Sequence, residues 1–159
     1  MSRWWTASGW ILAVACDGGT TTPTIGGCET GAAPALEIGV GLEGYEPLGE
    51  MGHFPLIHGP QGGFHLEIGL RATHLDTSDL ALGHMVGTID GTVYADSEPW
   101  IDFRCQNDVD AQEAYGMLLI YDSTPDFLDG KTTEVSVDVT DIAGNTVSAT
   151  RTFVIEDTL

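Results

Sequence analysis

The sequence is poor in basic residues. It contains five Lys and Arg residues against 24 Asp and Glu residues, which gives a formal net charge of −19 at pH 7. A surface that binds nucleic acid needs clustered positive charge. The composition therefore excludes nucleic acid as a partner, and anionic lipid headgroups would repel the chain as well. We interpret the acidic charge as a solubility feature, with Ca²⁺ ligation by clustered carboxylates as the alternative.

The chain also lacks the short motifs of common catalytic sites. It has no Gly-x-Ser-x-Gly elbow and no His-Glu-x-x-His pair, which mark many hydrolases and metalloproteases. No glycine-rich loop opens a helical pattern, so a nucleotide cradle is not expected. We therefore expect a protein that is not an enzyme. A hydrolase whose site the sequence does not display is the least favoured alternative.

The N-terminal apolar stretch, residues 4–15, is too short to span a membrane, which takes about 20 residues. Arg3 precedes it and small residues end it, which is the order of a secretory signal. The sequence Ala-Val-Ala-Cys at 13–16 resembles the lipobox of bacterial lipoproteins, although that family usually has leucine where Ala13 stands. The resemblance implies a signal peptide at 1–15 and a lipidated (palmitate-bearing) Cys16. The alternative is an ordinary signal with an incidental cysteine.

This resemblance also implies a location and a domain organisation. The chain would be lipid-anchored to a bacterial membrane, would face the periplasm or the exterior, and would contact the membrane through its N-terminal lipid. Residues 16–34 are rich in Gly, Thr and Pro and are predicted to form a flexible, disordered tether. Residues 35–159 have the length of one domain.

Cysteine is scarce, with only three residues in the chain. If Cys16 carries lipid, an even number remains in an oxidising compartment. We therefore expect a disulfide between Cys28 and Cys105, which would tie the end of the tether to the domain. The alternative is a pair of thiols with no bridge.

No stretch shows a sustained helical period, and the dominant period is two. At most, one helical turn is expected, at 108–116. Apolar and polar residues alternate as in strands with one buried face at 36–42, 64–70, 133–141 and 146–155. Shorter strands are expected at 100–105 and at 115–122, the second as a central strand. The dipeptides Asp90-Gly91 and Asp129-Gly130 indicate tight turns. The pattern predicts an all-β sandwich of about seven strands.

Residues 131–157 resemble the closing hairpin of bacterial immunoglobulin-like domains. An alternating strand runs into an Asp-x-x-Gly-Asn turn, and a second alternating strand follows. The resemblance implies an immunoglobulin-like antiparallel β-sandwich and says little about function. We expect a binding or structural module of the cell envelope that meets an envelope protein or a polysaccharide through a sheet edge or end loops. Trp100 and Tyr94 are expected in the core, with a contact surface as the alternative.

Two histidines, His58 and His65, flank the sequence Gly-Pro-Gln-Gly-Gly at 59–63. We interpret this sequence as a structural corner, because Pro fixes one φ and paired glycines permit a reversal. His65 would then share a solvated strand face with Glu67. The alternative is a copper site, because segment 51–85 contains five histidines between two methionines. Its ligands would be His58, His65 and Glu67.

A calcium site is the second metal alternative. Its candidate ligands are Asp138, Asp141 and Asn145, at the turn that joins the last two predicted strands, and further carboxylates lie at 90–102. Neither segment has the ligand spacing of an EF-hand loop. Loop carboxylates at one end of a sandwich can still converge on an ion. Apart from these two alternatives, no cofactor is expected.

Overall fold

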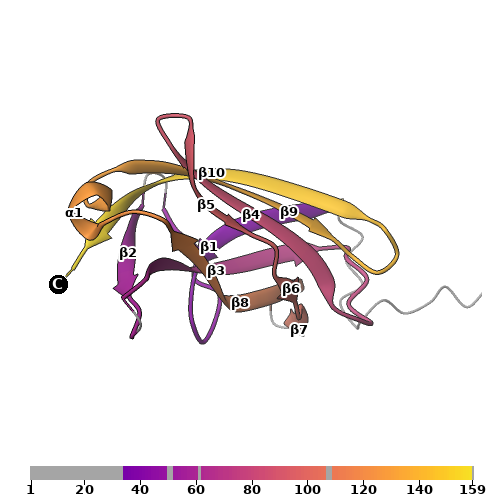
Figure 1. The fold of residues 1–159 in the computed structure, drawn as a ribbon. Coiled ribbons are helices and arrows are strands. Elements are labelled where there is room, and N and C mark those ends of the chain that lie inside the picture. Colours follow the sequence, from indigo (N-terminus) through magenta and orange to yellow (C-terminus); the bar gives the residue numbers. More distant parts are fainter. Residues whose placement is uncertain (1–33, 50–51, 61, 107–108, 159) are drawn as a thin grey trace, which may run out of the picture.

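The computed structural model describes residues 34–158 apart from 50–51, 61 and 107–108 (Figure 1). The predicted signal peptide, Cys16, Cys28 and nearly all of the tether lie outside the described residues. Within the described ranges the fold is all-β, with ten strands and one four-residue helix, α1 (Pro125–Leu128). In that part of the chain, no helix has the length and apolar character needed to cross a membrane.

The strands form two groups that share β2 (His53–His58). Sheet A has the order β1–β3–β8–β7, and sheet B has the order β5–β4–β9–β10, with β6 paired to β4. The bounds of the other strands are β1 (Ala35–Val40), β3 (Phe64–Thr73), β4 (Ala81–Ile89), β5 (Thr92–Ser97), β6 (Trp100–Ile101), β7 (Arg104–Gln106), β8 (Ala111–Tyr121), β9 (Thr132–Thr140) and β10 (Thr146–Asp157).

Strand β2 passes from one sheet to the other. Its first residues pair in parallel with the end of β10, where Phe54 lies opposite Ile155. Its last two residues pair antiparallel with the start of β3, and the turn at 59–63 then joins the two strands. The strand pairing is therefore mixed, with one parallel pair, β2 with β10, among antiparallel pairs. This corrects the expectation of a purely antiparallel arrangement. The sequence pattern did not show the parallel pairing, because alternation marks a strand without marking its neighbour.

The inner faces of the two sheets form one hydrophobic core. In Figure 1, β4, β9 and β10 form the upper layer, and β3 and β8 lie below them. Alternation places every second side chain inside, as in β9, where Val135, Val137 and Val139 are fully buried. The rings of Phe54 and Phe153 meet edge to face, with centroids 5.1 Å apart. Each such buried side chain contributes about 1.5–3 kcal/mol.

Three expectations about the strands are corrected. The described residues contain ten strands, not about seven, because the strand predicted at 100–105 is divided into β6 and β7, and because β2, β4 and β5 lie outside the predicted segments. The helical turn expected at 108–116 is wrong, because β8 occupies Ala111–Tyr121, and the four-residue helix follows at Pro125–Leu128 instead. Segment 115–122 is not a central strand. Strand β8 pairs with β3 along most of its length but with β7 only over Ala111–Glu113.

Candidate functional site

A groove opens on the side of the molecule where the chain crosses between the two sheets. Strand β6 pairs with β4 in sheet B, and three residues later β7 pairs with β8 in sheet A. The crossover therefore diverges from β8 and leaves a space of about 270 Å³ between them. We call this space the side groove, and its lining includes Trp100, Asp102, Arg104, Glu113, Tyr115 and Met117.

Trp100 is the most exposed large hydrophobic residue of the described ranges, at 68%. The expectation that it belongs to the core is wrong. Strand β6 has only two residues, and its neighbour Ile101 takes the inward position at 2% exposure, so alternation turns Trp100 outward. Tyr94, by contrast, is half-buried and packs against the core, and its ring lies 5.2 Å from that of Phe127.

Two oppositely charged side chains of the crossover form an ion pair at the groove. Arg104 donates from Nε and Nη2 to Asp102 Oδ2, at 3.1 and 3.0 Å. The hydrogen bond and the negative charge of Asp102 raise the pKa of Arg104. Both side chains are well exposed. The pair therefore presents hydrogen-bond donors and acceptors to a ligand but little net charge.

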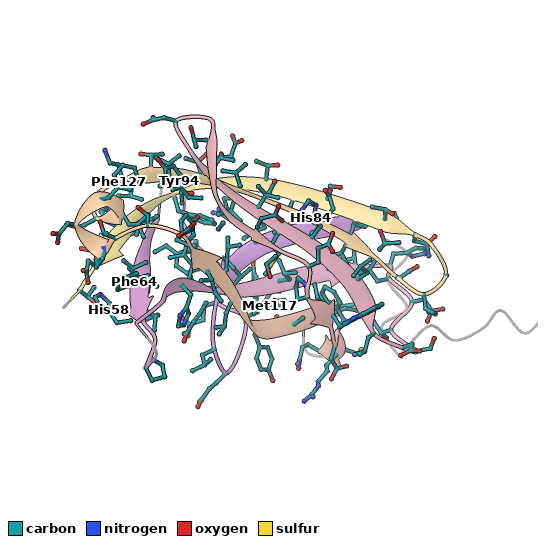
Figure 2. The ribbon with its side chains drawn as sticks, in the orientation of Figure 1. His58, Phe64, His84, Tyr94, Met117 and Phe127 are labelled. Atoms are coloured by element: carbon teal, nitrogen blue, oxygen red, sulfur yellow. The ribbon has the colours of Figure 1, made fainter. Side chains whose placement is uncertain are left out.

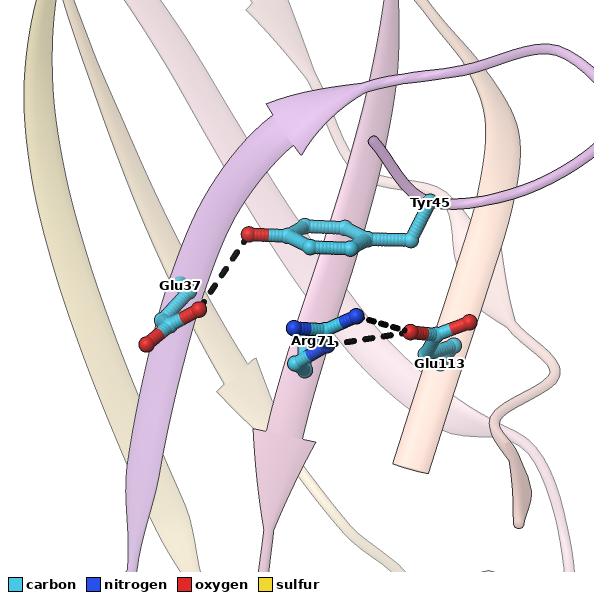
Figure 3. A network of polar contacts seen from close by, with 4 residues as sticks. All are labelled: Glu37, Tyr45, Arg71 and Glu113. Atoms are coloured by element: carbon cyan, nitrogen blue, oxygen red, sulfur yellow. Dashed lines mark hydrogen bonds and ion pairs between the residues drawn. The ribbon is translucent and has the colours of Figure 1, made fainter. Parts of the chain in front are cut away.

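Glu113 lies in the wall of the groove and is only 9% exposed. Its Oε1 accepts two bonds from Arg71, from Nε at 3.0 Å and from Nη2 at 2.7 Å (Figure 3). The guanidinium group lies 4.3 Å from the ring centre of Tyr45, whose hydroxyl donates to Glu37 Oε2 at 3.2 Å. This network fixes Glu113 in place. Among the described residues, no hydrogen bond to its second oxygen, Oε2, is seen.

The structure does not bring the copper candidates together. His58 Nε2 lies 3.0 Å from Asp157 Oδ1, and the ring packs against Phe64. His65 Nε2 lies 3.9 Å from Glu67 Oε1. His58 stands opposite Phe64 in the ladder and His65 stands opposite Ile57, so the two histidines point to opposite faces of the hairpin. His65 and Glu67 do share a strand face, as predicted, but this face is not solvated, because their side chains are only 13% and 22% exposed.

The histidines are also spread over the molecule as a whole. Figure 2 shows His58 beside Phe64 near one end and His84 toward the other. His84 Nε2 lies 3.0 Å from Asp96 Oδ1. Over residues 34–158, leaving aside 50–51, 61 and 107–108, no group of three or more His, Cys, Asp or Glu side chains is arranged to hold a metal ion.

Within the described residues, the calcium candidates do not form a cation site either. Asp141 and Asn145 do meet, but as acceptor and donor. Asp141 Oδ1 accepts the backbone N–H of Asn145, and Oδ2 accepts Asn145 Nδ2 and the backbone N–H of Asp76, each at 2.8 Å. Burial raises the pKa of Asp141, but hydrogen bonds from Asp76, Asn145 and Ala143 outweigh it and hold the pKa below the usual value. Asp138 is exposed and accepts from Ser148.

The chain matches no protein-family model, no curated protein and no solved structure. The case for a function therefore depends on the geometry of the side groove. Of its polar and aromatic residues, the sequence singled out Trp100, as a core or contact aromatic, and Asp102, among the calcium-candidate carboxylates at 90–102. Asp102, Arg104, Glu113 and Tyr115 belong to no local motif, because strand pairing brings them together from two segments. Cys105 lies in β7 next to the groove, and its predicted partner, Cys28, is outside the described residues.

Proposed function

We propose that this chain is a lipid-anchored binding module of a bacterial cell envelope, built on an immunoglobulin-like β-sandwich and without catalytic activity. The observation that carries the proposal is the side groove, where an exposed tryptophan stands beside fixed polar groups. Aromatic side chains, tryptophan among them, are enriched at contact sites relative to the rest of the protein surface. The partner is an envelope protein or a polysaccharide.

The strand arrangement supports the immunoglobulin-like assignment. In that fold, strands A, B, E and D form one sheet, and strands C, F and G form the other. Taken in chain order as A to G, the strands β1, β3, β4, β7, β8, β9 and β10 have the neighbours that this scheme requires. Strand β5 extends the second sheet beside β4, while β2 and β6 are additions to the scheme.

The lipid anchor is supported by the sequence around Cys16, and the charge of the chain bears on how an anchored domain would contact the membrane. A net charge of −19 would keep the domain away from anionic headgroups, so the acyl chains would make the membrane contact. The first described strand, β1, begins at Ala35. The predicted tether, 16–34, would then connect the anchor to the N-terminal edge strand of sheet A.

Membrane fractionation tests the anchor directly. The full chain is produced in a bacterium, and the processed protein is extracted from membranes and measured by intact mass spectrometry. We expect a chain that begins at Cys16 and carries lipid, and a Cys16→Ala variant that leaves the membrane fraction. Cys105→Ala is the cysteine control: it leaves the lipobox intact, so the chain recovered should still carry lipid on Cys16 even though the predicted disulfide is lost. A membrane-extracted protein that retains residues 1–15, or that has a bare Cys16, would refute the anchor.

A further inference from the structure

We propose that the side groove binds a neutral saccharide, with Trp100 as the stacking platform. This inference depends on the proposed function, because it assigns a ligand class to the binding module. The groove measures about 270 Å³, near the lower end of ligand pockets, so it would hold about one or two sugar rings. A longer glycan would continue outward past Trp100.

The exposed indole supplies the apolar part of the site. An aromatic ring has a flat face that packs well against another flat, weakly polar surface. One face of a sugar ring presents mainly C–H groups, and its rim presents hydroxyl groups. Trp100, at 68% exposure, would bury much of its side chain against such a ring. Tyr115, on the opposite wall of the groove, provides a second aromatic contact.

Hydrogen-bonding groups for the sugar rim are already held in position. Glu113 is 9% exposed, and both of its hydrogen bonds from Arg71 use Oε1. With Oε1 engaged by Arg71, Oε2 is the oxygen of this groove-lining carboxylate to which a sugar hydroxyl group would donate. Asp102 adds a second acceptor, and Arg104 adds donors. Hydroxyl groups both donate and accept, so they suit this mixed set.

The charges of the groove favour a neutral ligand. The net charge of −19 would repel uronic-acid and phosphate polymers. A basic peptide would suit the overall charge of the chain. The two groove carboxylates, however, are already paired, Asp102 with Arg104 and Glu113 with Arg71. A cation in the groove would have to compete with these arginines, whereas a neutral sugar uses the remaining lone pairs.

Tryptophan fluorescence provides a direct test. The chain contains four tryptophans, at positions 4, 5, 10 and 100. In the full chain carrying Trp4→Phe, Trp5→Phe and Trp10→Phe, all emission therefore comes from the groove. The probes are cellohexaose, mannohexaose and the hexamer of N-acetylglucosamine, with hexagalacturonate and a basic decapeptide as competing classes. We expect a saturable blue shift with at least one neutral oligosaccharide and none with hexagalacturonate.

Calorimetric titration of the responding oligosaccharide then locates the site. We expect Trp100→Ala to weaken binding at least about tenfold, a loss of about 1.4 kcal/mol. Ile142→Ala is the matched control, because Ile142 is also highly exposed, at 59%, but lies in the β9–β10 turn and should bind as the parent does. The inference is overturned if no neutral oligosaccharide binds, if Trp100→Ala binds as tightly as the parent, or if the basic peptide alone shifts the emission. None of these outcomes affects the anchor test at Cys16.

Discussion

The hydroxyl group of Tyr121 on β8 lies 2.8 Å from Thr133 Oγ1 on β9, so a buried hydrogen bond joins the inner faces of the two sheets. Thr133 Oγ1 in turn donates to the backbone carbonyl of Thr88, at 3.0 Å. The phenol fits only because residue 87 is glycine, since a Cβ there would lie 2.5 Å from the Tyr121 hydroxyl oxygen. These contacts set the spacing of the sheets at this point.

Tyr121→Phe should therefore destabilise the domain by about 1–2 kcal/mol, because Thr133 Oγ1 loses its buried hydrogen-bond donor. Chemical denaturation measures the change as a lower midpoint. Tyr115→Phe is the control, because no hydrogen bond to its hydroxyl group is seen in the described part of the chain, and its midpoint should stay within experimental error. Equal midpoints for the parent and the Tyr121 variant would contradict the inter-sheet bond.

Tyr121 should also make stability depend on alkaline pH. Burial raises the pKa of Tyr121 from 10.0 to about 12, against a smaller lowering by its bond with Thr133. The stabilisation is complete below the unfolded pKa and is lost as pH rises from about 10 to about 12, because the unfolded chain ionises first. The loss amounts to about 2–3 kcal/mol. Unfolding titrations at several pH values should show a larger loss in the parent than in Tyr121→Phe, which retains the contribution of Tyr45, whose pKa burial also raises.

Asp141 should be important for stability, because its carboxylate accepts three hydrogen bonds of 2.8 Å at the β9–β10 turn. Asp141→Ala removes the charged acceptor of these partly buried N–H groups and should cost about 2–3 kcal/mol. Asp138→Ala, on the exposed face of β9, should cost less than about 1 kcal/mol. Similar midpoints for the two variants in thermal denaturation would contradict this account.

The lowered pKa of Asp141 also predicts how the stability of the domain changes at acid pH. Because the folded pKa lies below the usual 3.8, its stabilisation is present above that value and is lost as pH falls through the folded pKa. The parent should lose stability more steeply below about pH 4 than Asp141→Ala does. Parallel acid-unfolding curves would show that the hydrogen bonds do not favour the charged form.

The disulfide between Cys28 and Cys105 stays a prediction, and strand register makes it feasible. Leu36, Ala72, Gln112 and Cys105 lie opposite one another across β1, β3, β8 and β7. Three strand spacings amount to about 14 Å, and the chain from 28 to 36 can reach about 26 Å when extended. Non-reducing peptide mapping should recover the cross-linked pair, and Cys105→Ser should lower stability by up to about 4–5 kcal/mol. Recovery of free thiols at both positions would contradict the bridge.

The alternation of apolar and polar residues predicted several strands well, because one face of each strand is buried in the core and the other is more exposed to solvent. Strands β1, β3, β9 and β10 lie within the predicted alternating segments or extend them by a few residues. The turn at Asp90-Gly91 is also confirmed, since both residues have positive φ. Local sequence could not assign neighbours to these strands. The parallel pairing of β2 with β10 and the short β7 beside β8 both depend on tertiary packing.

The candidate site was harder to predict for the same reason. Trp100 is followed by an apolar Ile101, and nothing in the sequence indicates which of the two faces inward. Glu113 looks like one of many surface carboxylates until the sheet places it against Arg71. His58 and His65 are separated by seven positions, and only the hairpin register shows that they point to opposite faces. Pairing between distant segments, not residue type, decides each case.

The exposure of Trp100 is the central claim of this account, because the groove, the proposed binding role and the ligand class all depend on it. Acrylamide quenching of the chain in which Trp4, Trp5 and Trp10 are replaced by phenylalanine measures it directly, since acrylamide is neutral and is not repelled by the acidic surface. The account predicts quenching of the folded protein close to that of free tryptophan and little change on unfolding. Weak quenching with blue-shifted emission in the folded state would place Trp100 in the core and contradict the account.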